Sequence, residues 1–319
     1  MRKKRIMQAK LLADRKGLTH EQWLELRKKG IGGSDAGAIL GLSPFSSAFT
    51  VYAEKIGIKK PAEETEAMRQ GTDLEAYVAQ RFTEKTGKKV VNCNYVLQHP
   101  EYDWMLADVD RLVVGENAGL ECKTTSAFNN TNFSRADVPP QYYAQCVHYM
   151  AVTGADRWYL AILVLGVGFY EFVIERNEEE IKALIELERR FWFDNVQSYV
   201  EPEVDGKKQT SDVINDMYIA VAGAKVDLMP YRNLLEDYTK LNEQIDNLNL
   251  AKEKIKQQLQ VYMANSTEGY TDNFKVTWKS QERPTVDTKR LQVEHPEIYN
   301  QYLKKSYSRP FNVFKKEQL

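Results

Sequence analysis

Hydrophobic residues along the first 200 residues of this chain recur with two different periods. Apolar positions spaced three or four apart predict amphipathic helices, whereas alternating apolar and polar positions predict strands. The predicted helices span 19–30, 49–56, 63–86, 141–152 and 178–196. The predicted strands span 89–98, 105–114, 120–125, 158–165 and 168–174. This order of helices and strands predicts an α/β core with a mixed sheet.

Two neighbouring predicted strands carry charged residues into apolar surroundings. The first, Met105–Val114, contains Asp108 and Asp110, and the second, Leu120–Thr125, contains Glu121. A turn-rich break, Gly115-Glu116-Asn117-Ala118-Gly119, separates them and favours a hairpin. The acidic residues of both strands are therefore candidates for one shared site.

The second of these strands indicates which reaction such a site could carry out. Because side chains alternate across a strand, Glu121 and Lys123 should point to one face and Cys122 to the other. If Asp110 reaches the same place from the neighbouring strand, two carboxylates and a lysine converge. That arrangement can hold a hard cation beside a water nucleophile, as phosphodiester hydrolysis requires.

The spacing of acid and lysine is weak evidence by itself. The same spacing occurs at Glu180/Lys182, Asp205/Lys207 and Asp287/Lys289, where a solvated charge pair is the expected role. Only the triplet that begins at Glu121 lies in an apolar strand behind a second acid-bearing strand. A partly buried structural ion pair remains the alternative at that triplet.

A glycine-rich segment, 30–41, follows the first predicted helix. It begins Gly30-Ile31-Gly32-Gly33, and Ser34 is placed to cap a helix of small residues. Backbone N–H groups at such a helix start can hold a phosphate, and Arg27 can add a bidentate contact. A tight turn without a ligand is the alternative, and no GK[ST] sequence follows that would mark a Walker motif.

The last third of the chain has a different character. A polar stretch, 201–210, predicts a linker. Residues 231–263 lack Gly and Pro, and their apolar residues follow a heptad register that Lys252 interrupts. They therefore predict a long helix, which either forms a coiled coil with another chain or packs within this region. Residues 274–279 alternate as a strand. In this strand and in the tail after it, basic residues stand beside aromatic ones, a pattern that suits binding of single-stranded nucleic acid or of a partner protein. A solvated strand face is the alternative. The basic residues of the tail are Lys304, Lys305, Arg309, Lys315 and Lys316.

Composition narrows the class of protein. The 319 residues are 43% hydrophobic and 28% charged, as in ordinary globular proteins. No apolar run approaches a membrane span and the N-terminus lacks a signal-peptide core, so we expect a cytoplasmic protein with no membrane contact. Three separated cysteines, Cys93, Cys122 and Cys146, support neither a disulfide framework nor a four-cysteine metal site. A net charge of −1 requires any DNA contact to use local basic patches.

Several segments, taken in order, resemble one known family. They read RKKGIGGSDAGAILG, QGTDLEAYVAQRF, LADVDRL, GLECKTT and YYAQCVHYMAVTG, and they are spread along the stretch Arg27–Leu165. The chain resembles the YqaJ-type viral recombinases, relatives of phage lambda exonuclease in the PD-(D/E)xK nuclease superfamily. The resemblance implies a restriction-endonuclease-like core over 19–200. A basic flexible N-terminus (1–18) would precede this nuclease domain, and a mainly helical region (201–319) would follow it.

The resemblance also implies a role for each candidate residue. Asp110 and Glu121 would bind Mg²⁺, with Mn²⁺ as the alternative ion, and Cys122 would offer its backbone carbonyl. Lys123 would orient or help deprotonate the attacking water, a role suited to a lysine whose pKa is lowered in a metal site. Helical Glu75 would support the metal site. The remaining implied residues are the active-site glutamine, Gln145, and the 5′-phosphate-binding pair, Arg27 and Ser34.

The implied activity is digestion of 5′-phosphorylated double-stranded DNA from the 5′ end, which leaves a 3′ single strand for a partner annealing recombinase. Relatives of this kind assemble as a homo-oligomeric ring trimer around DNA. Asp108 departs from the family pattern, because a phosphate-binding serine stands at that position in lambda-like enzymes, and an acid there would repel phosphate. The alternatives are an endonuclease of the same superfamily and a non-catalytic assembly protein that keeps the fold.

Overall fold

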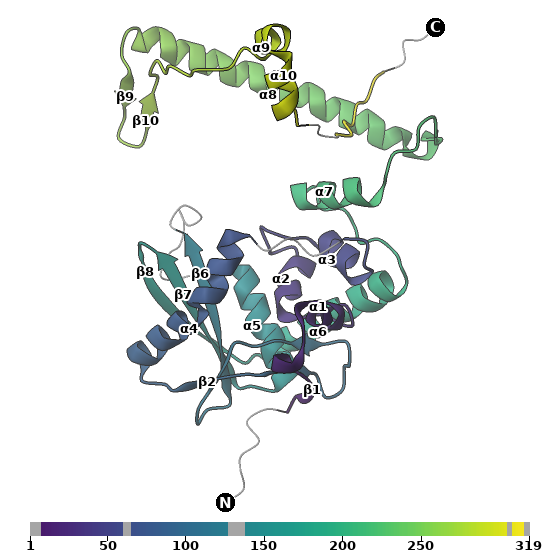
Figure 1. Cartoon of the computed structure of the whole chain (residues 1–319), viewed down its shortest axis with the longest axis vertical. Coiled ribbons are helices and arrows are strands. Elements are labelled where there is room, and N and C mark those ends of the chain that lie inside the picture. The colour runs from purple at the N-terminus through teal and green to yellow at the C-terminus, as the bar shows by residue number, and fades with distance from the viewer. Residues whose placement is uncertain (1–7, 60–64, 127–137, 305–307, 316–319) are drawn as a thin grey trace, which may run out of the picture. The chain divides into compact units, whose positions relative to one another are not determined.

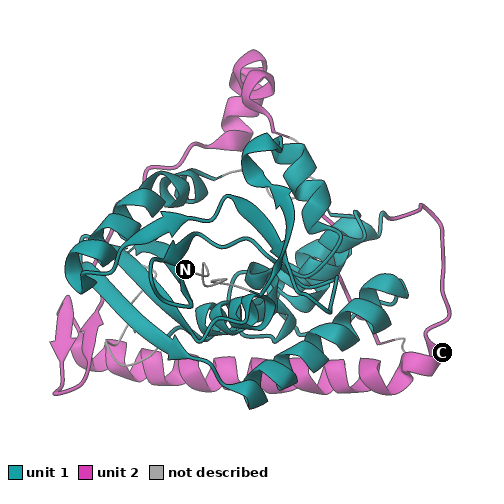
Figure 2. Ribbon diagram, turned by 90° about the horizontal axis from the view of Figure 1, so that it is seen from below, with its two compact units in different colours: residues 1–219 teal, residues 220–319 magenta. Residues whose placement is uncertain are grey.

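The computed structural model describes residues 8–59, 65–126, 138–304 and 308–315. The chain forms two compact units, Met1–Ile219 and Ala220–Leu319, which Figure 2 distinguishes by colour. No helix in the described part of the chain is long and apolar enough to cross a membrane. All residues that we expect to form the site belong to the first unit.

A five-stranded mixed sheet is the centre of the first unit (Figure 1). Its strands lie in the order β2-β5-β6-β7-β8, with β6 and β7 parallel and the other neighbours antiparallel. The strands are β2 (Val90–Asn92), β5 (Arg111–Val113), β6 (Ala118–Ser126), β7 (Arg157–Leu165) and β8 (Gly168–Glu175). The predicted α/β core with a mixed sheet is therefore confirmed.

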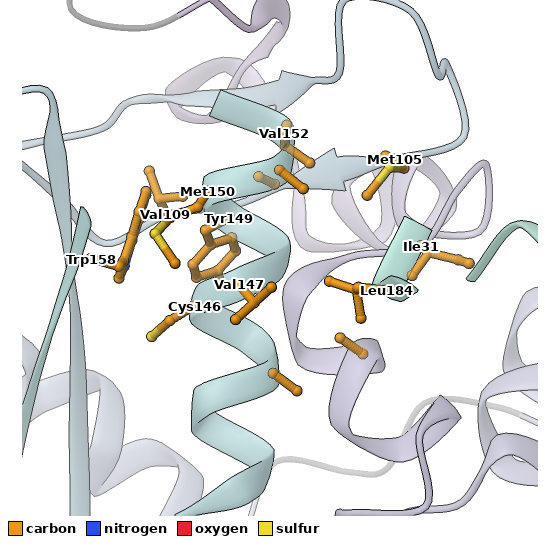
Figure 3. Close-up of a cluster of buried hydrophobic side chains, with 14 of the residues drawn as sticks. Ile31, Met105, Val109, Cys146, Val147, Tyr149, Met150, Val152, Trp158 and Leu184 are labelled. Carbon is orange, nitrogen blue, oxygen red and sulfur yellow. The ribbon is translucent and has the colours of Figure 1, made fainter. Parts of the chain in front are cut away.

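Helices cover the central sheet. The helix α4 (Glu66–Thr86) packs Val78 and Phe82 against Leu120 of β6. The larger hydrophobic core includes α5 (Pro140–Thr153), as Figure 3 shows, and α6 (Glu178–Arg190), which continues as a π-helix through Gln197. Because β6 lies between β5 and β7 and packs against α4, its backbone is firmly fixed.

A smaller sheet corrects three expectations. It consists of β1 (Lys10–Asp14), β3 (Tyr95–Gln98) and β4 (Leu106–Ala107) in the order β1-β3-β4. The N-terminal segment that we expected to be mobile thus contains a paired strand, followed by a short 3-10 helix, Arg15–Gly17. The predicted strands 89–98 and 105–114 are each divided, because their two halves pair in different sheets.

Three short helices precede α4. They are α1 (His20–Arg27), α2 (Gly33–Ile39) and α3 (Ala48–Lys55). A capping box between Thr19 and Gln22 begins α1. The prediction that Ser34 caps α2 is wrong, because Gly32 is the capping residue and its N–H donates to Asp35 Oδ2.

The glycine-rich segment is needed for close packing. A Cβ atom at Gly33 would lie 2.4 Å from Cε1 of Tyr149 on α5. Because real Cβ atoms do not approach a ring so closely, only glycine allows α2 to rest against α5 at this point. The segment thus brings Arg27 and Ser34 toward the face of α5 that carries Gln145.

The expected linker at 201–210 is partly structured. Its last residues begin α7 (Lys208–Met217), which packs Val213 against Phe49 and Ala53 of α3. Lys207 Nζ also donates to the carbonyl oxygens of Gly41 and Ser43, at 3.0 Å each. The first unit consequently extends beyond residue 200.

The second unit is built around the long helix α8 (Arg232–Met263), which confirms the predicted helix. The remaining elements are β9 (Glu268–Tyr270), paired with β10 (Lys275–Thr277), then α9 (Thr288–Glu294) and α10 (Pro296–Tyr302). Phe311 packs edge-on against Tyr238 of α8. The coiled coil remains a prediction. The basic residues Lys305 and Lys316 lie outside the described residues.

Candidate active site

The centre of the candidate site is the middle of β6. Glu121 and Lys123 lie on the face of β6 opposite Leu120 and Cys122, and Lys123 Nζ is 2.6 Å from Glu121 Oε1. The Glu121 side chain is only 3% exposed. Cys122 packs beside the hydrophobic cluster under α4, so strand alternation places its thiol away from the charged pair.

Asp110 reaches the same place from the start of β5. Its Oδ2 accepts a hydrogen bond of 2.8 Å from the backbone N–H of Cys122. Burial, together with the nearby carboxylates of Glu121 and Glu75, raises the pKa of Asp110 well above its usual range. Burial also raises the pKa of Glu121, although Lys123 opposes that change. Two carboxylates that are hard to ionise together therefore share this site.

Gln145 ties α5 to the acidic strands. Its Nε2 donates to Glu121 Oε1 and to the hydroxyl of Tyr149, at 2.8 Å each. The Tyr149 hydroxyl in turn donates to the backbone carbonyl of Asp108, at 3.0 Å. This chain of hydrogen bonds fixes the orientation of the Glu121 carboxylate.

Glu75 enters the site from α4 but is engaged by another residue. Arg111 Nη1 donates to Glu75 Oε1 and also to the backbone carbonyl of Asp110. Glu75 is close enough to raise the pKa of Asp110. It is thus a neighbour of the Asp110 and Glu121 pair, with its charge balanced by Arg111.

The residues present fit a divalent cation. Within the described part of the chain, no three Asp, Glu, His or Cys side chains are arranged as a ready-made metal cluster. However, Glu121 Oε2 is buried without a hydrogen-bond partner, which is costly for a carboxylate oxygen. Asp110 and Glu121 also repel each other. A hard cation between Asp110 and Glu121 would satisfy that oxygen and remove the repulsion.

Lys123 does not have the lowered pKa that we expected. Burial alone would lower the pKa of its ammonium group, but the Glu121 and Asp110 carboxylates outweigh burial and raise the pKa above its ordinary value. Lys123 therefore carries a positive charge and acts as a hydrogen-bond donor. Its Nζ also lies 5.1 Å from the centre of the Tyr142 ring.

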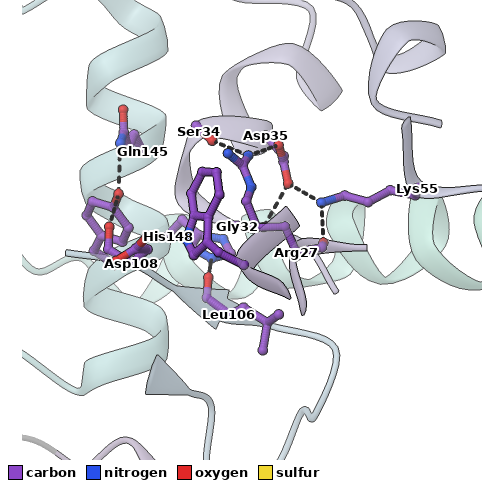
Figure 4. A network of polar contacts seen from close by, with 11 residues as sticks. Arg27, Gly32, Ser34, Asp35, Lys55, Leu106, Asp108, Gln145 and His148 are labelled. Atoms are coloured by element: carbon purple, nitrogen blue, oxygen red, sulfur yellow. Dashed lines mark hydrogen bonds and ion pairs between the residues drawn. The ribbon is translucent and has the colours of Figure 1, made fainter. Parts of the chain in front are cut away.

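Arg27 and Ser34 lie beside the carboxylates. Both line a cavity of about 180 Å³ whose wall also includes Asp110, Glu121 and Gln145. Arg27 Nη2 donates to Ser34 Oγ at 2.9 Å, as Figure 4 shows. The structure thus brings together the residues predicted to bind metal and the residues predicted to bind phosphate.

A buried ion pair, Asp35 with Lys55, holds Arg27 in place. Asp35 accepts from Lys55 Nζ at 2.6 Å and from Arg27 Nη2 at 3.1 Å (Figure 4). Burial alone would raise the pKa of Asp35, but Lys55 and Arg27 lower it to about 2. Lys55 Nζ also donates to the backbone carbonyl of Arg27, at 2.8 Å. The Asp35–Lys55 pair therefore holds both the main chain and the guanidinium of Arg27.

Asp108, the departure from the family pattern, is neutralised by its neighbours. The indole N–H of Trp23 donates to Asp108 Oδ2, and Arg15 Nη1 lies near Oδ1, at 2.8 Å each. Because Oδ2 accepts a hydrogen bond and Oδ1 forms an ion pair, Asp108 does not present a bare charge to the cavity.

Sequence reasoning missed four residues that organise this site: Arg15, Asp35, Lys55 and Tyr149. The spacing of Tyr149 four residues after Gln145 on one helix face was a usable signal. Asp35 and Lys55 are far apart in sequence, and their pairing depends on how α2 packs against α3.

Comparison with known proteins identifies the family. Residues 22–156 match the YqaJ-like viral recombinase domain. The chain is 34% identical over 310 residues to the uncharacterized protein YqaJ of Bacillus subtilis (strain 168), covering 96% of this chain and 97% of that protein.

Two solved structures are also similar. An alkaline exonuclease from Laribacter hongkongensis is 21% identical, with a TM-score of 0.49, over 56% of this chain and 94% of that one. A phage-related exonuclease from Haemophilus somnus 129PT is 12% identical, with a TM-score of 0.43, over 56% and 99%. On the full-length match to the Bacillus protein and the match to the domain, this chain belongs to the YqaJ-like viral recombinase family.

Proposed function

We propose that the protein is a metal-dependent exonuclease that digests double-stranded DNA from the 5′ end during phage-type recombination. The observation that carries this proposal is that Asp110 and Glu121 line one cavity with Arg27 and Ser34, while Lys123 pairs with Glu121 at 2.6 Å. Two carboxylates, an ammonium group and a phosphate-binding pair are the groups that hydrolysis of a terminal phosphodiester requires.

The carboxylates would hold the metal ion. Asp110 and Glu121 would bind Mg²⁺ or Mn²⁺, with the backbone carbonyl of Cys122 as a further ligand and Glu75 supporting the site. When bound, the ion would lower the pKa of a water molecule and neutralise charge that develops on the phosphate. Gln145 would keep Glu121 oriented through its hydrogen bond of 2.8 Å.

Lys123 would act as a cation. Since its pKa is raised, it would donate a hydrogen bond to the attacking water or to a phosphate oxygen, and it would stabilise negative charge in the transition state. Arg27 and Ser34 would bind the 5′-terminal phosphate. Arg27 is suited to this role because its side chain remains 35% exposed although Asp35 holds it in place.

Strand-specific digestion of linear DNA tests the proposal. The unaltered protein should release nucleotides from the 5′ strand of a 5′-phosphorylated duplex with Mg²⁺ and should stop when a chelator is added. Glu121→Ala and Lys123→Ala should each lower turnover by about 10²–10⁴-fold while the protein stays folded. Lys182→Ala is the matched control, because Lys182 has the same spacing from an acid but is exposed on α6.

The same assay separates the alternatives. An exonuclease leaves closed circular DNA intact, whereas an endonuclease cuts it. A non-catalytic assembly protein releases no nucleotide under any condition. Digestion that begins at the 3′ end, or that proceeds unchanged in Lys123→Ala, would contradict the proposed mechanism.

We further propose that the 3′ tails are passed to a single-strand annealing recombinase and that the protein assembles as a ring trimer. The net charge of −1 supports an enclosing assembly, because the chain lacks an overall attraction for DNA. Light scattering should give three times the mass of one chain without duplex, and that mass plus one duplex with it; a single protein chain in both conditions would contradict the ring.

A further inference from the structure

Asp110 forms part of the wall of a second cavity. This cavity has a volume of about 250 Å³, and its lining includes Arg15, Lys16, Glu75 and Arg111 as well as Asp110. Because Asp110 also lines the cavity that contains Arg27, the two cavities meet at the proposed metal site. A DNA strand held at Arg27 and hydrolysed beside Asp110 therefore has a second cavity next to its reacting phosphate.

Arg15 is held firmly at this second cavity. It directly follows β1, and its backbone N–H donates to the carbonyl of Asn94 at 2.8 Å. Its guanidinium pairs with Asp108 at 2.8 Å, yet the side chain remains 40% exposed. A guanidinium has five donors in a planar fork, so Arg15 can bind Asp108 along one edge and an anion along another.

Asp108 and Trp23 connect Arg15 with Arg27. Trp23 donates its indole N–H to Asp108, and Arg27 Cζ lies 5.0 Å from the centre of the Trp23 ring. Asp108 therefore connects Arg15 on one cavity with Trp23 and Arg27 on the other. An aspartate at position 108 is useful here, because one of its oxygens accepts from the indole while the other pairs with the guanidinium.

We propose that Arg15 binds a backbone phosphate of the DNA adjacent to the phosphate that is hydrolysed, and that Asp108 is the positioning residue that holds Arg15 in place. This inference rests on the proposed function and deepens it. Arg111 in the same cavity is engaged by Glu75 and only 10% exposed, whereas Arg15 is 40% exposed, so Arg15 is the guanidinium there that a phosphate can reach.

Binding of a linear 5′-phosphorylated duplex to the full-length protein tests this inference, measured in Ca²⁺ at several salt concentrations and followed by digestion in Mg²⁺. Arg15→Ala should weaken binding about tenfold. It should also reduce the slope of log affinity against log salt by about one. Turnover at saturating DNA should change far less. A change in salt slope is the readout that a purely structural role for Arg15 would not produce.

Asp108→Asn tests the positioning role. An asparagine keeps an acceptor for the Trp23 indole but loses the charge that holds Arg15, so it should reproduce most of the Arg15→Ala effect. In the double variant the two effects should not add, because Asp108 acts through Arg15. If Asp108→Asn does not fold, Arg15→Ala and Arg15→Gln still decide whether Arg15 contacts phosphate.

The matched control is Arg157→Ala. Arg157 forms a similarly exposed ion pair, with Glu175, but lines neither cavity, so binding and salt slope should stay unchanged. Normal binding and salt slope in Arg15→Ala, while the unaltered protein digests DNA, would overturn the inference alone. Fully additive effects in the double variant would overturn the role of Asp108. An unaltered protein that neither binds nor digests DNA would overturn the proposed function, and this inference with it.

Discussion

The two units of this protein differ in where they keep their apolar side chains. In the described part of the chain, every buried residue belongs to the first unit, and the last of them is Val213. The helix α8 of the second unit instead exposes its apolar positions, among them Leu241, Ile245 and Leu248. Among the described residues, the first unit is therefore the one that holds charged groups in a medium of low dielectric, where their interactions are strong enough for chemistry.

Ion pairs show the same contrast. The first unit buries Asp35 with Lys55 and His148 with Glu188. In the ion pairs along α8, such as Lys240 with Asp237, both side chains are exposed to solvent. Exposed pairs contribute little to stability, whereas a buried charge that loses its partner is strongly destabilising. Substitutions of the same kind should consequently have different effects in the two units.

The largest contrast should come from removing a leucine in each unit. Leu160→Ala, in the middle of β7, should lower the free energy of unfolding by about 2–5 kcal/mol, because the side chain is fully buried and leaves a cavity. Leu248→Ala should change it by no more than about 0.5 kcal/mol, since Leu248 is 70% exposed. Urea denaturation of the full-length protein measures both. A large loss in Leu248→Ala would contradict the exposed position of this residue.

A smaller contrast should come from removing an acid in each unit. With chelator present, Asp110→Asn should raise the free energy of unfolding by about 1 kcal/mol. Its carboxyl has a raised pKa in the folded state, so its ionised form opposes folding above the usual pKa of an aspartate. The same variant should lose nuclease activity and should no longer be stabilised by Mg²⁺. Asp237→Asn on α8 is the control and should change neither property. A destabilised Asp110→Asn would contradict the repulsion argument.

The smallest contrast concerns pH. Burial alone would lower the pKa of His148, but the Glu188 carboxylate outweighs burial and raises it above the usual value. Its Nε2 also lies 2.8 Å from the Leu106 carbonyl oxygen, which can only accept a hydrogen bond (Figure 4).

A raised pKa in the folded state means that this stabilisation is complete below the ordinary histidine pKa. It is lost as the pH rises through the folded-state value. Glu188→Gln removes the carboxylate and should make the fall in melting temperature above about pH 6.5 shallower. Glu297→Gln, beside the exposed His295, is the control and should leave the profile unchanged. An unchanged slope in Glu188→Gln would show that the pair does not hold the proton.

Local patterns predicted most of the helices and the position of the charged strand. The helices α4, α5 and α8 and the strand β6 follow from the periodicity of apolar residues, which acts over a few residues. Strand pairing acts over long distances. Nothing local shows that residues 10–14 pair with β3, or that the run 105–114 divides between two sheets.

The candidate site likewise has features that the local sequence predicts and features that depend on contacts distant in sequence. Alternation along β6 was enough to place Glu121 beside Lys123, as the distance of 2.6 Å between them shows. The role of Asp108 could not be predicted, because its partners Trp23 and Arg15 come from the N-terminal segment. The pKa of Lys123 also depends on two carboxylates whose distances only the folded chain defines.

The hydrogen bond from the main chain of Cys122 to Asp110 has a consequence for how this sequence can evolve. Position 122 stands between two residues that we propose to be catalytic, yet its contribution to the site comes from the peptide group that every amino acid except proline supplies in full. Its thiol faces the hydrophobic cluster, and burial raises the pKa of that thiol. Natural selection at this position should act on volume and polarity rather than on sulfur chemistry, so homologues are expected to tolerate valine or alanine there while they retain both charged neighbours.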